Sequence, residues 1–150
     1  MNVDHGGNRV TIRSHTGIIM FLNMVPINFY SKKQLTIESS TYGSEFIALE
    51  AAQEMLDSLI YKLKMLGVPI SGPVRMFYDK KSVVKSSTFP DSALKNKHCS
   101  IVYHKIREAV AQLTYLIYYE KPSTNLANLF AKVLSATKRE SLIPAILTGG

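Results

Sequence analysis

The sequence predicts an α/β domain in which helices pack over a mixed β-sheet. Short runs rich in β-branched and aromatic residues alternate along the chain with longer segments of helical periodicity, which is typical of that architecture. The chain has 150 residues, of which 46% are hydrophobic, enough for one core of ordinary size. We therefore expect one domain over residues 1–136. The C-terminal tail, residues 137–150, carries Pro144 and a terminal Gly-Gly and is expected to be frayed.

The predicted sheet begins with a hairpin. The run from Gly17 to Leu22 is short and β-branched at its start, and the run from Pro26 to Ser31 alternates apolar and polar residues. Residues 23–24 supply the turn between them. Two more strands are expected, the run VRMFY that ends at Asp79 and the run from Leu113 to Tyr119, which is β-branched and aromatic.

The clearest predicted element is a long helix from Thr41 to Leu66, which Gly67 and Pro69 bring to an end. Its apolar side chains recur at three- and four-residue spacing and form one stripe: Leu49, Ala52, Leu56, Leu59, Leu63 and Leu66. A short helix is expected from Lys81 to Lys85, and a second long one from Lys97 to Gln112.

A final helix is predicted after Pro122, with Ser123 as its N-cap. Its apolar residues also recur at helical spacing: Leu126, Leu129, Phe130, Val133 and Leu134.

The chain is basic, with 18 Lys and Arg against 11 Asp and Glu and a formal net charge of +7. This balance favours contact with a polyanion such as nucleic acid, although a solvated basic surface is the alternative. Cys99 is the only cysteine, so neither an internal disulfide nor a cysteine-rich zinc site is expected. We expect an intracellular protein, cytoplasmic or nuclear.

No secretory or membrane segment is predicted. The first ten residues are polar and do not match the apolar part of a signal peptide. The longest apolar stretch, from Gly17 to Tyr30, is interrupted by Asn23, Pro26 and Asn28 and is too short for a membrane span of about 20 residues.

Two acids occupy positions where apolar residues are expected. Glu45 lies four residues before Leu49 and shares the helix stripe, and Asp79 closes an otherwise apolar strand. Together they suggest carboxylates that converge at one end of the sheet, where oxygen ligands hold divalent cations. The alternatives are structural. The helix macrodipole favours an acid in the first turn, and Asp after a strand commonly forms a turn.

The histidines indicate no metal site. His98, Cys99 and His104 match no common spacing of zinc ligands. His104 and Arg107 are interpreted as lining a helix face that is solvated or touches phosphate.

Short motifs follow one another in order between residue 2 and about residue 135. They are Asp4-His5-Gly6-Gly7-Asn8 with Arg13-Ser14-His15-Thr16-Gly17, Ser31-Lys32-Lys33-Gln34, Ser44-Glu45-Phe46-Ile47-Ala48-Leu49, Tyr78-Asp79, Lys97-His98 with Tyr103-His104-Lys105-Ile106-Arg107-Glu108, and Asn125-Leu126-Ala127-Asn128-Leu129. In this order and spacing they resemble the ribonuclease H domain of copia-type (LTR) retrotransposon polyproteins.

The resemblance implies a ribonuclease H-like fold over residues 1–136, with a mixed sheet flanked by helices. It also implies cleavage of the RNA strand of an RNA–DNA hybrid by a pair of Mg²⁺ ions that a set of four acids holds. By position, Glu45 corresponds to the second acid and Asp79 to the third. An upstream reverse transcriptase domain in the same polyprotein is a further expectation.

The chain departs from that family at the first and last acids, where it has Asn2 and Asn128. Asparagine keeps a carbonyl oxygen but no charge, and each charge lost at about 4 Å forgoes roughly 4 kcal/mol of gross attraction to a unit charge. Lys80 and Lys81 add positive charge beside the third acid, so we expect weak Mg²⁺ binding. Asp4 shares a strand face with Asn2 but lies roughly 6–7 Å further along, so it is not expected to substitute.

The first strand, which is central in this fold, is expected to be largely truncated because only Met1 to Asp4 are available to form it. Buried backbone groups left unpaired are costly. We expect the isolated chain to fold poorly unless upstream polyprotein sequence or the tail fills the gap.

Three hypotheses stay open. The first is an active ribonuclease H that uses Glu45 and Asp79. The second, which we prefer, is a catalytically inactive remnant that keeps the fold and a basic surface for an RNA–DNA hybrid. The third is a basic structural domain without a nucleic-acid partner. The predicted nucleic-acid contacts are Arg13, Lys32, Lys33, Lys97 and Arg107.

Overall fold

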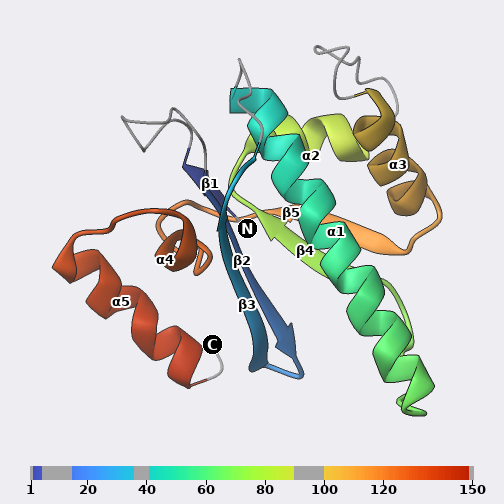
Figure 1. The fold of residues 1–150 in the computed structure, drawn as a ribbon, viewed down its shortest axis with the longest axis horizontal. Helices are drawn as coiled ribbons and strands as arrows, with labels where there is room; N and C mark the ends of the chain where they lie inside the picture. Colours follow the sequence, from blue (N-terminus) through green and yellow to red (C-terminus); the bar gives the residue numbers. More distant parts are fainter. Residues whose placement is uncertain (1, 5–14, 36–40, 90–99, 149–150) are drawn as a thin grey trace.

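The computed structural model describes residues 2–4, 15–35, 41–89 and 100–148 (Figure 1). In chain order the elements are β1 (Asn2–Asp4), β2 (His15–Leu22), β3 (Val25–Lys33), α1 (Thr41–Met65), β4 (Val74–Tyr78), α2 (Lys81–Thr88), α3 (Ser100–Ala111), β5 (Tyr115–Tyr119), α4 (Asn128–Ala131) and α5 (Ala136–Leu147). This is a mixed α/β architecture that is compatible with a ribonuclease H-like fold, so the predicted fold class is confirmed.

The strands form an antiparallel sheet in the order β1-β2-β3 and a parallel pair, β4-β5. The predicted hairpin between β2 and β3 is confirmed. Its two turn residues, Asn23 and Met24, have φ angles of 48° and 69°, and positive values at both positions match the turn twist to the twist of the strands.

The first strand has three residues, as the truncation predicted. It pairs with β2 from Asn2 opposite Gly17 to Asp4 opposite His15, and it lies at the edge of the antiparallel sheet. Within the described ranges no pairing joins β1 to β4, so the antiparallel and parallel sheets are separate.

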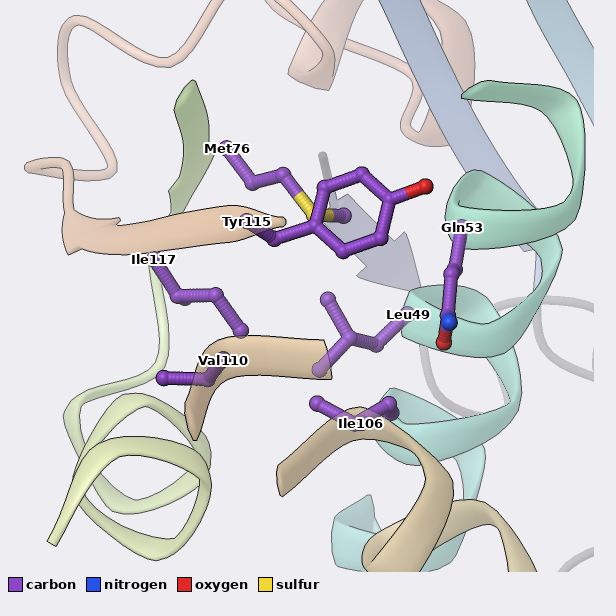
Figure 2. A pocket seen from close by; sticks show the side chains of 7 residues that line it. All are labelled: Leu49, Gln53, Met76, Ile106, Val110, Tyr115 and Ile117. Carbon is purple, nitrogen blue, oxygen red and sulfur yellow. The ribbon is translucent and has the colours of Figure 1, made fainter. Parts of the chain in front are cut away.

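Helices α1 and α3 cover one face of β4 and β5 and form the main core (Figure 2). The side chains that meet there come from all four elements and leave no water-sized space between them: Leu49, Gln53, Met76, Ile106, Val110, Tyr115 and Ile117. On β2, Ile18 and Met20 join the same core. Figure 1 shows α1 on one side of the β2-β3 hairpin, with α4 and α5 on the other.

The predicted final helix is wrong over most of its length. Residues 122–124 and 126–127 form turns, and only α4, residues 128–131, is helical there. A nearby side chain there pairs with a backbone group that a helix would otherwise use, since Asn125 Oδ1 accepts a hydrogen bond from the Ala127 backbone amide at 3.1 Å. Short polar side chains of this kind compete with helix formation, which the apolar spacing does not reveal.

The tail was expected to be frayed, and this too is wrong. Helix α5 spans Ala136–Leu147 and includes Pro144, and its Leu142 is buried. Most of the residues before Pro144 are good helix formers, and one buried leucine gives the helix an apolar anchor. No helix in the described part of the chain has the length and apolar character to cross a membrane.

Candidate functional site

Glu45 is the most unusual residue of α1, because its carboxyl group is buried. Only 1% of the residue is exposed, on the face that packs against the sheet. The helix begins at Thr41 and has no acid in its first turn, so the macrodipole does not account for Glu45. The Tyr78 hydroxyl, fully buried at the end of β4, donates to Glu45 Oε2 and lies 2.8 Å from its backbone oxygen.

Gln34 fixes the start of α1 relative to the antiparallel sheet. Its side-chain Nε2 donates to Thr16 Oγ1 on β2 at 3.0 Å and to the Ser44 backbone oxygen at 2.9 Å. Ser44 immediately precedes Glu45, so this bridge positions the helical turn that carries the acid. Sequence reasoning missed the role of Gln34, although the residue closes one of the motifs.

Asp79 follows β4 directly and is 6% exposed. The pKa of the Glu45 carboxyl is raised from 4.5 to about 7, mainly by burial; the Tyr78 hydrogen bond opposes this rise and the negative charge of Asp79 adds to it. Burial also raises the pKa of Asp79, and the ammonium groups of Lys132 and Lys80 oppose that rise. The structure therefore brings Glu45 and Asp79 into one electrostatic cluster.

This acidic pair, Glu45 and Asp79, has two buried oxygens without a hydrogen-bond partner, Glu45 Oε1 and Asp79 Oδ1. Such oxygens are the ligands that a hard dication prefers. Lys80 Nζ lies 4.0 Å from Glu45 Oε1, and the charge of half-buried Lys132 acts on both acids. Among the described residues, no group of three or more His, Cys, Asp or Glu side chains could hold a metal ion.

Asn128 begins α4 and is 2% exposed. Its side-chain Nδ2 donates to the Pro122 backbone oxygen at 2.7 Å, which fixes the amide within its own turn. Lys132 directly follows α4, so its action on both acids places this short helix beside the acidic pair.

Gly17 lets α4 approach the antiparallel sheet closely. A Cβ atom at this position would lie 2.5 Å from the Ala127 backbone oxygen and 2.8 Å from the Ala131 nitrogen. Asn2 pairs with Gly17 across β1 and β2, so its backbone lies where α4 meets the sheet. The side chain of Asn2 lies outside the described part of the structure.

The predicted nucleic-acid contacts are only partly described. Lys32 is exposed and Lys33 half-buried at the end of β3. Arg107 on α3 donates to the Tyr103 hydroxyl and lies 5.1 Å from the centre of that ring, so the protein itself engages the guanidinium. Arg13 and Lys97 lie outside the described residues, as do His98 and Cys99, which were considered for metal binding.

Two further residues of the site were missed by sequence reasoning, Tyr78 and Lys132. Tyr78 lies two residues after inward-facing Met76 on β4, and the period of two along a strand therefore marks it as buried. Lys132 carries no such signal, because a lysine after a short helix is ordinarily solvated.

The relatives found by comparison with known proteins include two retrovirus-related Pol polyproteins. The chain is 25% identical over 136 residues to the retrovirus-related Pol polyprotein from transposon RE1 of Arabidopsis thaliana. The matched region covers 91% of this chain and 9% of that protein. The chain is also 25% identical over 134 residues to the corresponding polyprotein from transposon RE2 of the same plant, with 89% and 9% covered. No family profile matches the chain, and neither does a solved structure.

The chain thus spans about 9% of the length of these curated relatives. Its similarity extends along nearly the whole of the sequence given, and it supports derivation of this domain from a retrotransposon polyprotein. The resemblance stated from the motifs is confirmed at that level.

Proposed function

We propose that this chain is a ribonuclease H-like domain of retrotransposon origin that has lost efficient hydrolysis of RNA in RNA–DNA hybrids. One observation carries the proposal. The acidic pair Glu45 and Asp79 is flanked by Lys80 and Lys132, while Asn128 occupies the last acid position with its amide fixed on Pro122.

The residues present do not fit a pair of Mg²⁺ ions. Two dications need several carboxylates, and this site combines two carboxylates with two nearby ammonium groups that already offset their charge. The buried oxygens without partners, Glu45 Oε1 and Asp79 Oδ1, leave room for weak binding of one cation at most. We therefore assign no hydrolytic step to bound metal in this chain.

The comparisons support the retrotransposon part of the proposal, since both relatives are named as retrovirus-related Pol polyproteins. An upstream reverse transcriptase domain and an RNA–DNA hybrid as the natural partner remain parts of the proposal. The ordered motifs, the acidic pair and the net charge of +7 are the observations that favour them.

Cleavage of a labelled RNA–DNA hybrid in Mg²⁺ tests the proposal. We expect the unmodified chain to cleave no faster than the Glu45→Gln variant. The combined change Asn2→Asp, Lys80→Asn and Asn128→Asp supplies the missing acids and removes one ammonium group, so it is expected to raise the rate. Cleavage by the unmodified chain that Glu45→Gln abolishes would refute the loss of activity.

The Asn128→Asp change needs its own control, because the carboxylate would face the Pro122 backbone oxygen that Nδ2 now contacts at 2.7 Å. Each variant is therefore first compared with the parent by circular dichroism and thermal unfolding. Asn128→Ala, which lacks both the donor and the charge, separates loss of the hydrogen bond from gain of the acid.

Binding without cleavage is the second candidate function. Exposed Lys32 at the end of β3 and the excess of basic residues favour contact with hybrid phosphates. Affinity for a hybrid in EDTA should fall as salt rises, and Lys32→Gln should reduce the slope of log affinity against log salt by about 0.9. Absence of salt-dependent binding would instead favour a structural domain.

A further inference from the structure

Strand β3 forms one edge of the antiparallel sheet, and in the described part of the chain it pairs only with β2. None of the residues of β3 is buried, whereas four residues of β2 are. Phe29, in the middle of β3, is 65% exposed. A strand of nine residues at the edge of a sheet presents a row of backbone N–H and C=O groups that can pair with another strand.

A groove with a volume of about 420 Å³ lies beside β3, between the strand and α1. Its lining is part apolar and part polar: Asn28 and Tyr30 from β3, and Ala51, Glu54, Met55, Ser58, Leu59 and Lys62 from α1. The charged residues of the lining are one acid, Glu54, and one base, Lys62. Lys105 Nζ lies 3.9 Å from Glu54 Oε1 without lining the groove. A groove of this kind favours an occupant with little charge of its own.

The sequence of β3 itself provides such a strand. The seven residues from Val25 to Ser31 are uncharged, and the two charged residues, Lys32 and Lys33, stand together at one end. If two β3 strands pair antiparallel with Phe29 at the centre, each lysine lies opposite an uncharged residue near the hairpin turn of the other copy. A parallel pairing would place the lysines of the two copies opposite each other, and like charges in that position destabilise a sheet.

We propose that β3 pairs antiparallel with β3 of a second copy of this chain, about a two-fold axis at Phe29. Asn28 of each copy then lies opposite Tyr30 of the other on the face that holds the groove, so the groove receives side chains from both copies. The two Phe29 rings meet on the opposite face, where each already stacks on its own Phe130 with centroids 5.6 Å apart. An aromatic pair directly across two strands is a stabilising contact.

The contact is closed but weak. Because the same surface is used by both copies, assembly stops at the dimer. The pairing is short, since Pro26 has no backbone N–H and the register with β2 shifts between Met20 and Phe21, close to Pro26. The net charge of +7 on each chain adds repulsion between the copies. Salt screens that repulsion, so the dimer should become stronger as salt rises, whereas pairing with an acidic partner would become weaker.

Sedimentation velocity of the unmodified full chain, over a series of protein concentrations at low and high salt, is the first test. We expect a concentration-dependent equilibrium of monomer and dimer that shifts toward dimer at high salt and forms no larger species. A monomer at all concentrations, growth beyond the dimer, or a dimer that salt weakens would overturn the proposal. Glu45 and Asp79 belong neither to the groove nor to β3, so these outcomes are independent of the cleavage assay.

Charge substitutions at the axis test the register. Phe29→Lys and Phe29→Glu each bring two like charges opposite each other, so each variant alone should dimerise about tenfold or more weakly than the parent. An equal mixture of the two variants brings opposite charges together at the axis and should dimerise more tightly than either variant alone. This gain also shows that both variants fold, although each has lost the ring that stacks on Phe130.

The matched control is Ile101→Lys, which places the same charge at an apolar residue that is 81% exposed on α3. Figure 1 shows α1 between α3 and the β2-β3 hairpin, so this variant should dimerise like the parent. Parent-like dimerisation of either Phe29 variant alone, no gain in their mixture, or an equal loss in Ile101→Lys would contradict pairing through β3.

Discussion

Glu45 places a carboxyl group in the buried face of α1. Its place on an apolar helix stripe marked it as unusual, and the structure buries it to 1% exposure beside Tyr78 and Asp79. An ionised carboxylate in such a place is disfavoured by desolvation, so the side chain is held at a cost to stability.

That cost predicts a pH dependence of stability. The unfolded chain ionises Glu45 near pH 4.5, whereas the folded chain keeps its proton until about pH 7, so the unfolded state binds fewer protons in between. The free energy of unfolding should therefore fall as pH rises from about 4.5 to 7, by about 3 kcal/mol from this residue, and then level off. Urea unfolding in EDTA at a series of pH values measures it.

The control for this measurement is Glu45→Gln, which keeps the shape but cannot ionise. The variant should lose most of the decline between pH 4.5 and 7, retaining the part that Asp79 contributes in the same direction. A parent and a variant with parallel pH profiles would show that Glu45 is not desolvated as described.

Tyr78 gives a second prediction at the scale of one residue. Its hydroxyl donates to Glu45 Oε2, and this hydrogen bond lowers the pKa of the carboxyl against the effect of burial. Tyr78→Phe should cost about 1–3 kcal/mol, since a buried acceptor loses its donor. The loss should be larger at pH 8 than at pH 4, because the ionised acid needs the donor more. Equal losses at both pH values would contradict this role.

Among the elements, α4 depends on a close approach that only glycine permits. A side chain at Gly17 would meet the backbone of Ala127 and Ala131 rather than flexible atoms. Ser31 Oγ, which donates to the Phe130 oxygen at 2.5 Å, and the stacked rings of Phe29 and Phe130 also attach this short helix to β3.

Gly17→Ala is therefore expected to displace α4 and to destabilise the domain by about 1–3 kcal/mol, the usual range for overpacking. Because α4 carries Asn128 and precedes Lys132, the change should also alter the titration of Glu45. Thermal unfolding and the pH profile together measure both effects. Ser31→Ala, which removes an exposed hydrogen bond without adding volume, is the mild control and should cost about 1 kcal/mol or less.

The elements that sequence predicted well are those with long or unambiguous patterns. The apolar stripe that includes Leu49 and Leu63 predicted α1 nearly to both of its ends, and the turn at Asn23 predicted the hairpin. The final helix was overpredicted because its apolar spacing is helical while Asn125 and Asn128 bond the backbone locally. Helix α5 was missed because Pro144 suggested a break, whereas in the structure the helix continues through Pro144, whose backbone oxygen accepts a hydrogen bond from the Thr148 amide.

For the site, single-sequence reasoning found both acids but not their surroundings. Glu45 and Asp79 stand out because acids are rare in apolar patterns. Lys132 and Gln34 act on the site from distant parts of the chain, through charge and through hydrogen bonds to Thr16 and Ser44. Contacts between such distant positions have no local signature in one sequence.

At the scale of the whole molecule, the short first strand explains why the sheet is in two parts. β1 pairs with β2 over three residues, and the described residues show no pairing between β1 and β4. The main core survives this division because α1 and α3 pack against β4 and β5, and β2 contributes Ile18 and Met20 to the same cluster. The architecture therefore persists while the central pairing expected of a ribonuclease H-like sheet is missing.

The charges of the whole site also predict its response to metal. Lys80 and Lys132 already offset the negative charge of the acidic pair. Added Mg²⁺ is therefore expected to bind the folded chain little more tightly than the unfolded chain. We expect millimolar Mg²⁺ to shift the unfolding midpoint of the parent no more than it shifts that of Glu45→Gln. The variant Lys80→Asn, which removes the ammonium 4.0 Å from Glu45 Oε1, should show a larger Mg²⁺ effect than the parent.

Counting bound Mn²⁺ by paramagnetic resonance is the most direct measurement of whether this site can hold a catalytic pair of metal ions. The account predicts no saturable binding at two ions per chain in the parent, and tighter binding once Asn2→Asp, Lys80→Asn and Asn128→Asp are combined. Two tightly bound ions in the unmodified chain, lost on Glu45→Gln, would contradict it.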